Sequence, residues 1–340
     1  MRLLVLGGTA FLSRAVAEEA LRRGHDVVCA ARGASVSVPP GARLLAWDRT
    51  GPPPDELAEL ASGVDAVVDV ARHPSWVRRA VRLLPDAHWV FVSSISVHPD
   101  HGTPGGTPET LATLEPLDED ADPMASPETY GAMKVACERH VRAGAATSLV
   151  VRPGLIVGPG DPTGRFSYWP ARLADTAAWP EVLVPGSPDD SVQLIDVRDL
   201  AGWLVESAER RRTGLLDGVA RPMTRAAFVD AVAAAARDLG RHDPATSSFT
   251  AVDQEFLLEQ GVEPWMGPDS IPLWLPQPAY AGMMAHDPAA SYAAGLVTRP
   301  LAETARDTLL WLDEHPEAVV TGIGRSRESD ILAAWHAARA

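Results

Sequence analysis

One lysine and one tyrosine stand out in this sequence for the chemistry that they could do together. The chain has 30 basic residues, and all of them except Lys134 are arginines. Tyr130 lies four residues before Lys134, and side chains at this spacing share one face of a helix. An ammonium ion beside a phenol favours the phenolate form, which makes the tyrosine a usable proton donor or acceptor. The pair therefore predicts acid–base catalysis, with codon bias as the alternative reason for a single lysine.

A cluster of serines offers the hydrogen-bond donors that a carbonyl reaction needs. Ser93, Ser94 and Ser96 follow the apolar run Trp89–Val92, which we expect to be a strand. Ligands of parallel α/β sheets bind at the carboxyl ends of the strands. A serine hydroxyl there can stabilise negative charge that grows on a substrate oxygen. In the alternative interpretation, these serines only cap the next turn.

A glycine turn near the N-terminus indicates a dinucleotide site. Gly7 and Gly8 follow the apolar run Leu3–Leu6 and precede a helical pattern. In this context, backbone N–H groups and a helix N-terminus can meet a pyrophosphate. Ala10 and Ser13 replace the second and third glycines of the usual pattern, and both are small. The alternative is a simple strand-to-helix turn.

The end of the second expected strand bears on which dinucleotide would bind. NAD-binding proteins usually place Asp or Glu about 20 residues after the glycines, to bind the ribose 2′-hydroxyl. Here the run Val27–Ala31 is followed by Arg32 and by no acid. Because Arg32 could bind a 2′-phosphate through charge-assisted hydrogen bonds, we predict NADP(H) in preference to NAD(H). Otherwise, Arg32 is a solvated surface cation.

The elements that must position these residues alternate between strand and helix patterns. Helical patterns cover Ala15–Arg23 and Trp76–Leu84, and Ser126 with Pro127 begins the helix that carries Tyr130. The expected strands are Leu3–Leu6, Val27–Ala31, Arg43–Trp47, Ala66–Ala71, Trp89–Val92 and Ser148–Val151. This alternation predicts an α/β fold with a Rossmann-type doubly wound parallel sheet.

The second half of the chain is expected to form a smaller, irregular domain. Its expected elements are a strand at Val192–Ile195 and helices at Asp199–Glu209, Arg225–Leu239 and Leu301–Leu312. We predict an NADP-binding domain over residues 1–160 with parts of 190–220, and a mostly substrate-binding domain with the C-terminal helices over 161–340. The segment His98–Pro127 contains six prolines, so we expect a long loop that is either a mobile lid or a plain surface insertion.

Composition and charge exclude several classes of protein. The 340 residues are 46% hydrophobic and 22% charged, which is typical of a globular chain. A formal charge of −15 argues against nucleic acid as a partner. Two cysteines cannot form a disulfide framework, and no His, Asp or Glu spacing suggests a metal. Neither a secretory signal nor a run of ~20 apolar residues is present, so we expect a cytoplasmic protein with no membrane partner.

Taken together, these motifs resemble the extended short-chain dehydrogenase/reductase family, in an atypical branch like the NAD(P)-dependent epimerases and dehydratases. The matching segments are Gly7–Thr9, Ser93–Val97, Tyr130 to Lys134, Val151–Gly160, Ile195–Asp199 and Arg299–Thr304. The resemblance implies about seven strands and a small C-terminal domain that closes the substrate cleft. The chain departs from the family at Ala10 and Ser13, and at His98, where many members have tyrosine. Tyr130 also follows Ser94 by 36 positions, farther than is usual in the family.

The resemblance also implies roles for individual residues. Ser94 matches the catalytic serine, Tyr130 the catalytic acid/base and Lys134 its partner. Asp48 matches a position near the adenine, and Pro153 a position beside the nicotinamide. With Arg32 included, the residues expected to bind the cofactor are Gly7, Thr9, Ala10, Phe11, Leu12, Arg32, Asp48, Ala71, Lys134 and Pro153.

The substrate wall is marked less clearly. Tyr168 and Trp169 follow a Pro/Gly turn beyond the sixth strand, where they either stack on a substrate or belong to the core between domains. Further substrate candidates are Ser96, Gln193, Trp265 and Met266. Arg72 and His73 follow the fourth strand and are expected at the cleft mouth, unless they are simply solvated.

Three functions fit these residues. The first is an NADP(H)-dependent oxidoreductase that transfers hydride to or from a small carbonyl or alcohol. The second is an NAD-dependent sugar-nucleotide epimerase, which the missing acid after the second strand disfavours. A dehydratase is disfavoured further, because Ser94-Ile95-Ser96 lacks the acid and base of the family's Thr-Asp-Glu set. The third is a non-catalytic NADP-binding protein. By analogy with the family, a homodimer is also an expectation.

Overall fold

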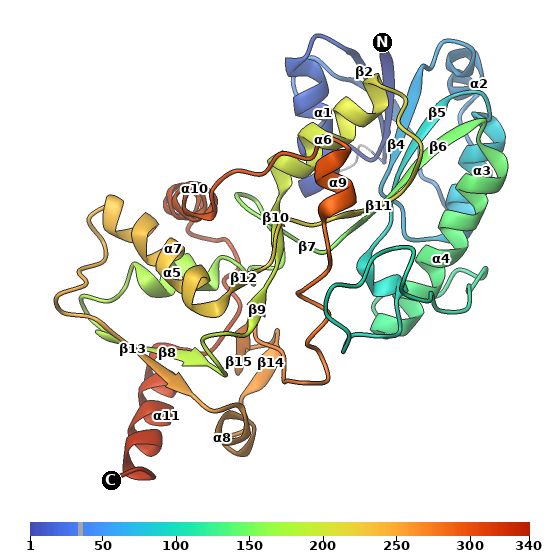
Figure 1. Cartoon of the computed structure of the whole chain (residues 1–340). Coiled ribbons are helices and arrows are strands. Elements are labelled where there is room, and N and C mark those ends of the chain that lie inside the picture. The colour runs from blue at the N-terminus through green and yellow to red at the C-terminus, as the bar shows by residue number, and fades with distance from the viewer. Residues whose placement is uncertain (33–36) are drawn as a thin grey trace.

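Seven parallel strands form the central sheet of the protein, in the order β11-β6-β5-β4-β1-β2-β3. The structure is a computed structural model that describes residues 1–32 and 37–340. The strands are β1 (Arg2–Leu6), β2 (Asp26–Ala31), β3 (Arg43–Ala46), β4 (Ala66–Asp69), β5 (His88–Val92), β6 (Thr147–Pro153) and β11 (Gly214–Gly218). The expected Rossmann-type doubly wound sheet is therefore confirmed (Figure 1).

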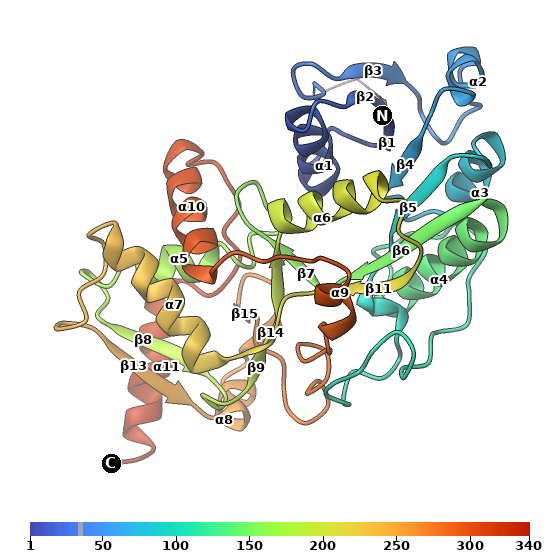
Figure 2. The same cartoon turned by 45° about the horizontal axis from the view of Figure 1, so that its top comes forward.

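Helices cover both faces of this sheet (Figure 2). One face packs against α1 (Phe11–Arg22) and α6 (Val197–Glu209), which also contact each other. The other face packs against α2 (Asp55–Ala61), α3 (Pro74–Leu83) and α4 (Pro127–Gly144). Because both faces are covered, the inner strands are buried on both sides and are continuous apolar runs in the sequence.

The strand expected at Val192–Ile195 is not a single strand. It divides into β9 (Ser191–Val192) and β10 (Leu194–Asp196), and neither joins the central sheet. β10 pairs with β7 (Leu155–Val157), whereas β9 pairs with β12 (Met223–Thr224). Gln193 lies between the two, and its side-chain amide binds the backbone of Ala220 and His286.

A second hydrophobic core lies beyond the sheet and contains Trp169, Phe228 and Trp274. The elements of this part are α5 (Tyr168–Leu173), β8 (Glu181–Pro185), α7 (Arg225–Asp238), β13 (Ser248–Val252), α8 (Gln254–Glu259), β14 (Glu263–Trp265), β15 (Ser270–Pro272), α10 (Leu301–Glu314) and α11 (Arg325–Ala337). The chain returns to the sheet at α6, β11 and α9 (Ala289–Ala293). The domain division near residue 160 stays a prediction.

The segment His98–Pro127 forms no strand and contributes only the first residue of α4 to a helix, as expected. It follows the short 3₁₀ turn η1 (Ile95–Val97). Residues 101–106 pair with residues 282–287 through four backbone hydrogen bonds of 2.7–3.0 Å, and we call this pairing the clasp (Figure 1). Farther along, Asp118 binds Arg78 and His140 of α3 and α4. The loop is therefore attached on two sides, which favours a surface segment over an open lid.

Candidate active site

Lys134 is buried at the carboxyl edge of the sheet, where it joins α4 to two strands. The residue is only 2% exposed, and its Nζ donates to the carbonyl oxygens of Ala71 and Val92, each at 2.7 Å. Ala71 follows β4, and Val92 ends β5. A lysine ammonium has three donors, so one N–H is left for a ligand. A planar guanidinium could not direct one compact charge at both carbonyls in this space, which explains why this cation is a lysine.

Tyr130 lies one turn before Lys134 on α4. The helix begins where expected, because Ser126 Oγ accepts a hydrogen bond from the Thr129 N–H at 3.1 Å and Pro127 occupies the first turn. The Lys134 ammonium lies 6.0 Å from the centre of the Tyr130 ring. The ring is half-buried. The structure thus brings the pair to one site, and its catalytic role stays a prediction.

Ser94 and Ser96 lie at the same edge, directly after β5. Ser94 Oγ accepts a hydrogen bond from the Ser96 N–H and donates one to Ser96 Oγ, both at 3.1 Å. Ser94 is thereby the N-cap of η1. It follows Val92, the strand end that Lys134 binds, by two residues. The hydroxyl pair and the lysine are therefore positioned by the same strand.

Gly131 allows α4 to approach these serines and was missed by the sequence analysis. A Cβ atom at this position would lie 2.0 Å from the Ser96 carbonyl oxygen, a distance that no real side chain tolerates. The helix that carries Tyr130 therefore packs directly on the backbone of η1. A glycine immediately after Tyr130, inside a helix, was the signal in the sequence for such a close approach.

The turn between β1 and α1 fits a diphosphate. Gly7 and Gly8 have φ values of 132° and 96°, in the region that favours glycine. A Cβ on Gly8 would lie 2.4 Å from Cys29 Sγ, so the turn lies directly on β2. Ala10 gives no side-chain cap to α1, and its first turn holds no acid. The positive end of the helix dipole is thus left for an anion.

Ser13 accounts for one departure from the glycine pattern. Its hydroxyl donates to the Ala10 carbonyl at 2.8 Å and fills the space beside Gly7, where a Cβ would lie 3.0 Å from Ser13 Oγ. Thr9, Phe11 and Leu12 lie in the same turn or at the start of α1. Phe11 has a φ of 27°, which is unusual for a side chain of this size. The expected cofactor residues of this turn are therefore together in space.

The far end of the predicted cofactor site is formed by β2 and β3. Arg32 and Asp48 follow these adjacent strands, and both are exposed. Hydrogen bonds from the Thr50 N–H and hydroxyl, assisted by the charge of Arg32, hold the pKa of Asp48 below its usual value. This arrangement leaves the Arg32 guanidinium accessible to a phosphate.

Arg49 was also missed by the sequence analysis. It is buried and binds Asp69 through two hydrogen bonds of 2.8 and 3.0 Å. Asp69 in turn accepts a hydrogen bond from the Ala71 N–H at 2.9 Å, and the carbonyl of the same Ala71 accepts one from Lys134 Nζ. Asp69 ends a buried apolar strand, and a buried carboxylate requires a partner, so the sequence could have signalled that a cation such as Arg49 lies beside it.

A buried polar network supports the site from behind. Glu138, one turn after Lys134, accepts hydrogen bonds from Ser93 Oγ at 2.5 Å and from Arg152 at 2.9 and 2.7 Å. Arg152 Nη1 also donates to His98 Nε2 at 3.3 Å, while His98 Nδ1 donates to the Ala112 carbonyl at 2.8 Å. Burial lowers the pKa of His98, so this histidine is a neutral connector. Pro153 follows Arg152 at the end of β6.

Three of the expected substrate residues are not available to a substrate. Tyr168 and Trp169 are 3% and 0% exposed in the second core, and the Trp169 indole donates to the Pro272 carbonyl at 2.8 Å. Both residues therefore belong to a core, the second of the two alternatives that we gave for them, and the prediction that they contact a substrate is corrected. Gln193 is corrected in the same way, because it is buried and its amide is used by backbone groups.

The remaining candidates have ordinary surroundings. Met266 and Arg72 are exposed, and His73 is half-buried with its ring centre 4.5 Å from that of Trp76. Trp265 is half-buried beneath Arg165, whose guanidinium lies 4.8 Å from the ring centre. None of these contacts by itself indicates a ligand.

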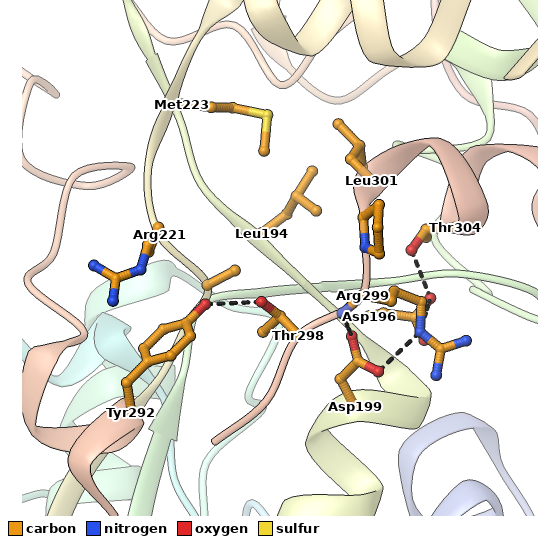
Figure 3. Close-up of a pocket in the computed structure, with 12 residues that line it drawn as sticks. Leu194, Asp196, Asp199, Arg221, Met223, Tyr292, Thr298, Arg299, Leu301 and Thr304 are labelled. Atoms are coloured by element: carbon orange, nitrogen blue, oxygen red, sulfur yellow. Dashed lines mark hydrogen bonds and ion pairs between the residues drawn. The ribbon is translucent and has the colours of Figure 1, made fainter. Parts of the chain in front are cut away.

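One pocket of about 270 Å³ lies away from the catalytic edge, between β10, α6 and the start of α10 (Figure 3). Its polar groups bind one another: Arg299 pairs with Asp199 at 2.8 Å, and Tyr292 shares a hydrogen bond of 2.8 Å with Thr298. Ser94, Tyr130 and Lys134 are not among its lining residues. The candidate catalytic residues therefore lie outside this pocket.

No metal site and no membrane helix were found in the part of the chain that the structure describes. There, no group of three or more His, Cys, Asp or Glu side chains is arranged to hold a metal ion. Likewise, no helix within residues 1–32 and 37–340 has the length and apolar character needed to cross a membrane.

Comparison with known proteins agrees with this fold. Residues 3–216 match the NAD dependent epimerase/dehydratase family. Among solved structures, UDP-glucose 4-epimerase is similar with a TM-score of 0.60 and 14% identity, covering 94% of this chain and 99% of that one. An enzyme of Bordetella bronchiseptica, WbmH in complex with NAD+, is similar with a TM-score of 0.58 and 16% identity, covering 92% and 99%. At these identities, the structural likeness concerns the fold alone.

Two curated relatives share more of the sequence over shorter spans. A dTDP-6-deoxy-L-talose 4-dehydrogenase (NAD(P)(+)) of Kitasatospora kifunensis is 30% identical over 174 residues, 47% of this chain and 54% of that protein. A 2'-dehydrokanamycin reductase of Streptomyces kanamyceticus is 32% identical over 226 residues, 64% of this chain and 60% of that protein. The matches thus span little more than half the length of each relative.

The fold and the assembled sheet edge define an α/β protein of the short-chain dehydrogenase/reductase type. The chain belongs to the NAD dependent epimerase/dehydratase family, a family of nicotinamide-dependent enzymes.

Proposed function

We propose that this protein is an NADP(H)-dependent oxidoreductase that transfers hydride to or from a small carbonyl or alcohol substrate. The observation that carries the proposal is the buried Lys134 ammonium, held by two backbone carbonyls beside Tyr130 with one donor left. A chain that only binds a dinucleotide would not need a buried cation next to a phenol.

The residues at the sheet edge have complementary tasks in this reaction. In the reducing direction, the Tyr130 hydroxyl gives its proton to the substrate oxygen as the carbonyl carbon gains a hydride, so that an alcohol forms. Ser94 turns its one O–H from Ser96 Oγ to the same oxygen and donates a hydrogen bond while negative charge grows on it. Lys134 stabilises the phenolate that remains and keeps one N–H for a ribose hydroxyl. When bound, the nicotinamide supplies or accepts the hydride.

The relatives suggest which substrates to test first. One is named for the oxidation of a deoxy sugar linked to a nucleotide, and the other for the reduction of an aminoglycoside ketone. Both names describe a secondary alcohol or a ketone on a sugar ring. We therefore propose ring ketones and secondary alcohols of sugar derivatives as the first substrate class.

The test is NADPH absorbance with a panel of such substrates in both directions. With a substrate found, Tyr130→Phe should lower turnover by at least about 100-fold, because it removes the proton donor, while cofactor binding persists. Tyr292→Phe is the matched control, since that hydroxyl binds Thr298 away from the sheet edge. Full activity of Tyr130→Phe would contradict the assignment.

An NAD-dependent epimerase is the second candidate, because the matched family includes epimerases. An epimerase recycles its cofactor, so the purified protein would carry bound NAD and need no added nucleotide. Chromatography of the nucleotide released by denaturation distinguishes the two proposals. Stoichiometric NAD would favour the epimerase, whereas an empty site that takes up NADP(H) favours the oxidoreductase.

A further inference from the structure

One buried arginine differs from the others in this protein. Four arginines of the described chain are buried, and three of them bind a carboxylate at 2.5–3.0 Å. These three pairs are Arg49 with Asp69, Arg152 with Glu138 and Arg172 with Glu328. The fourth is Arg225, which is 1% exposed, and no described carboxylate oxygen lies within 4.0 Å of its guanidinium. An isolated buried charge is costly, so its retention calls for an explanation.

The contacts of Arg225 leave most of its donors unused. Its Nη1 donates to the Leu273 carbonyl at 3.2 Å, and its Nε is buried with no partner among the described residues. The charge of Asp190 partly opposes the effect of burial on the pKa of Arg225, but the two side chains form no hydrogen bond. The Asp190 carboxylate accepts the Ser187 N–H at 3.0 Å. Burial lowers the pKa of Arg225 to about 10, so the guanidinium is still charged at neutral pH.

A second unused donor lies in the same region. Trp274 follows Leu273, is 0% exposed, and its indole N–H has no partner within the described chain. A Cβ on Gly186 would lie 3.6 Å from this indole nitrogen and 2.5 Å from Asp190 Oδ2. The backbone N–H of Arg225 binds the Asp190 carbonyl at 2.8 Å. The loop at Gly186–Asp190 therefore connects the arginine and the tryptophan.

The end of α7 itself does not explain these free donors. The first N–H groups of the helix are already bound: that of Arg225 to Asp190, that of Ala226 to Pro188, and that of Ala227 to the Thr224 hydroxyl. Leu273, which supplies the one acceptor of the guanidinium, has a φ of 64°, an uncommon conformation for leucine. The backbone is thus held in an unfavourable conformation beside a charge that it only partly satisfies.

We propose that Arg225, together with the Trp274 indole, binds an oxyanion, the phosphate or carboxylate group of a small-molecule ligand. An oxyanion offers several acceptors to donors that otherwise have none, and in a buried site such charge-assisted hydrogen bonds are strong. The other buried cation without a carboxylate partner in the described chain is Lys134, whose free donor we assign to the cofactor. Gly282, the first residue of the clasp on this side, follows Trp274 by eight residues.

The test measures thermal unfolding of the full chain with potassium phosphate, potassium acetate or potassium chloride at equal ionic strength. Each series is run with and without saturating NADP+, which keeps phosphate out of the turn at Gly7 and Gly8. We expect phosphate or acetate, but not chloride, to raise the Tm of the wild type. Because phosphate also stabilises proteins by exclusion from their surface, only the part of a response that R225M lacks counts. Such a response to phosphate alone would indicate a phosphoryl group, and to acetate alone a carboxylate. Since no turnover is measured, the result is separate from the proposed oxidoreductase activity.

The decisive variant is R225M, which removes the charge and keeps most of the volume. Without anions, R225M should be at least as stable as the wild type, and its apparent Kd for the anion should be at least tenfold weaker. R172M is the matched control: it leaves the buried Glu328 unpaired and should lower the Tm while keeping the anion response.

Two results would overturn the proposal. One is the absence of any Tm increase in the wild type with phosphate and acetate, and the other is an equal increase in R225M. Should R225M fail to fold, W274F decides, because it removes one donor and leaves the charge. A weaker anion response in W274F supports the site, and an unchanged response in that variant rejects it.

Discussion

At the scale of the residue, the type of cation decides what each buried position can do. Lys134 directs a small ammonium at two carbonyls and keeps one donor, whereas the buried arginines of the sheet, Arg49 and Arg152, use planar guanidinium groups to bind carboxylates. Arg49 supports the strand end that Lys134 binds, because its partner Asp69 accepts the Ala71 N–H, whereas Arg152 binds Glu138, one turn after Lys134 on α4. The buried lysine and the buried arginines therefore differ in their partners as well as in their residue type.

The proposed preference for NADP(H) can be tested at a single residue, Arg32. We expect Arg32→Asp to lower the NADP+ to NAD+ affinity ratio by about 10- to 100-fold, because a charge-assisted phosphate contact is replaced by repulsion. Both affinities can be measured by quenching of tryptophan fluorescence. Arg82→Asp, at another exposed arginine, is the control and should leave the ratio unchanged. An unaltered preference in Arg32→Asp would show that another group selects the cofactor.

At the scale of the element, α4 and η1 act as one unit. The helix supplies Tyr130 and Lys134, the turn supplies Ser94, and the two touch where Gly131 meets the Ser96 carbonyl. Neither element alone holds the three side chains. The distance between them is set by the absence of a single methyl group.

Gly131→Ala tests this contact. The added methyl must separate α4 from η1, which should cost about 1–3 kcal/mol of unfolding free energy and lower kcat at least tenfold. Urea unfolding and steady-state kinetics provide the two measurements. Gly202→Ala in α6 is the control, because a Cβ there has no contact shorter than 3.9 Å, and alanine should stabilise that helix by about 1 kcal/mol. Equal behaviour of the two variants would refute the steric argument.

At the scale of the whole molecule, two hydrophobic cores are connected around the candidate site. The sheet and the second core are joined by the clasp and by Gln193, which binds both the N–H and the carbonyl of His286. The sheet in turn buries polar groups such as His88, whose ring is 0% exposed in β5. The stability of the whole chain therefore depends on the charge state of such groups.

His88 gives the chain a pH-dependent stability. Burial lowers the pKa of His88 to about 4, from 6.5 in the unfolded chain. Between these values only the unfolded state takes up the proton, so this stabilisation is complete above pH 6.5 and is lost as the pH falls toward 4. The loss is at most about 3 kcal/mol.

Urea unfolding between pH 7 and pH 4.5 measures this effect. We expect a smaller loss of unfolding free energy over that range in His88→Leu than in the wild type. His101→Gln, at a half-exposed histidine that water can hydrate in either state, should retain the wild-type slope. A wild-type slope in His88→Leu would rule out this residue as the cause.

Local patterns in the sequence were sufficient for most of the sheet and for the catalytic helix. The inner strands β1, β4 and β5 are largely apolar runs because parallel strands covered on both faces are buried throughout, and the start of α4 is encoded by Ser126 and Pro127. The spacing of Tyr130 and Lys134 follows from the helical repeat alone. Such features depend on neighbours in the chain, which the sequence contains directly.

The tertiary structure alone decided the features that depend on distant segments. From the sequence, Tyr168 and Trp169 could line a substrate or belong to a core. The structure places both in a core, where Tyr168 packs on Trp169, and Trp169 contacts Phe228 and Pro272. Asp69 likewise finds its partner, and Lys134 its carbonyls, in segments far along the chain. Whether such a segment brings a partner to Arg225 Nε could not be read from the sequence, and none of the described residues does. Sequence determined which chemical groups are present, and folding decided which of them are satisfied by the protein and which are left for a ligand.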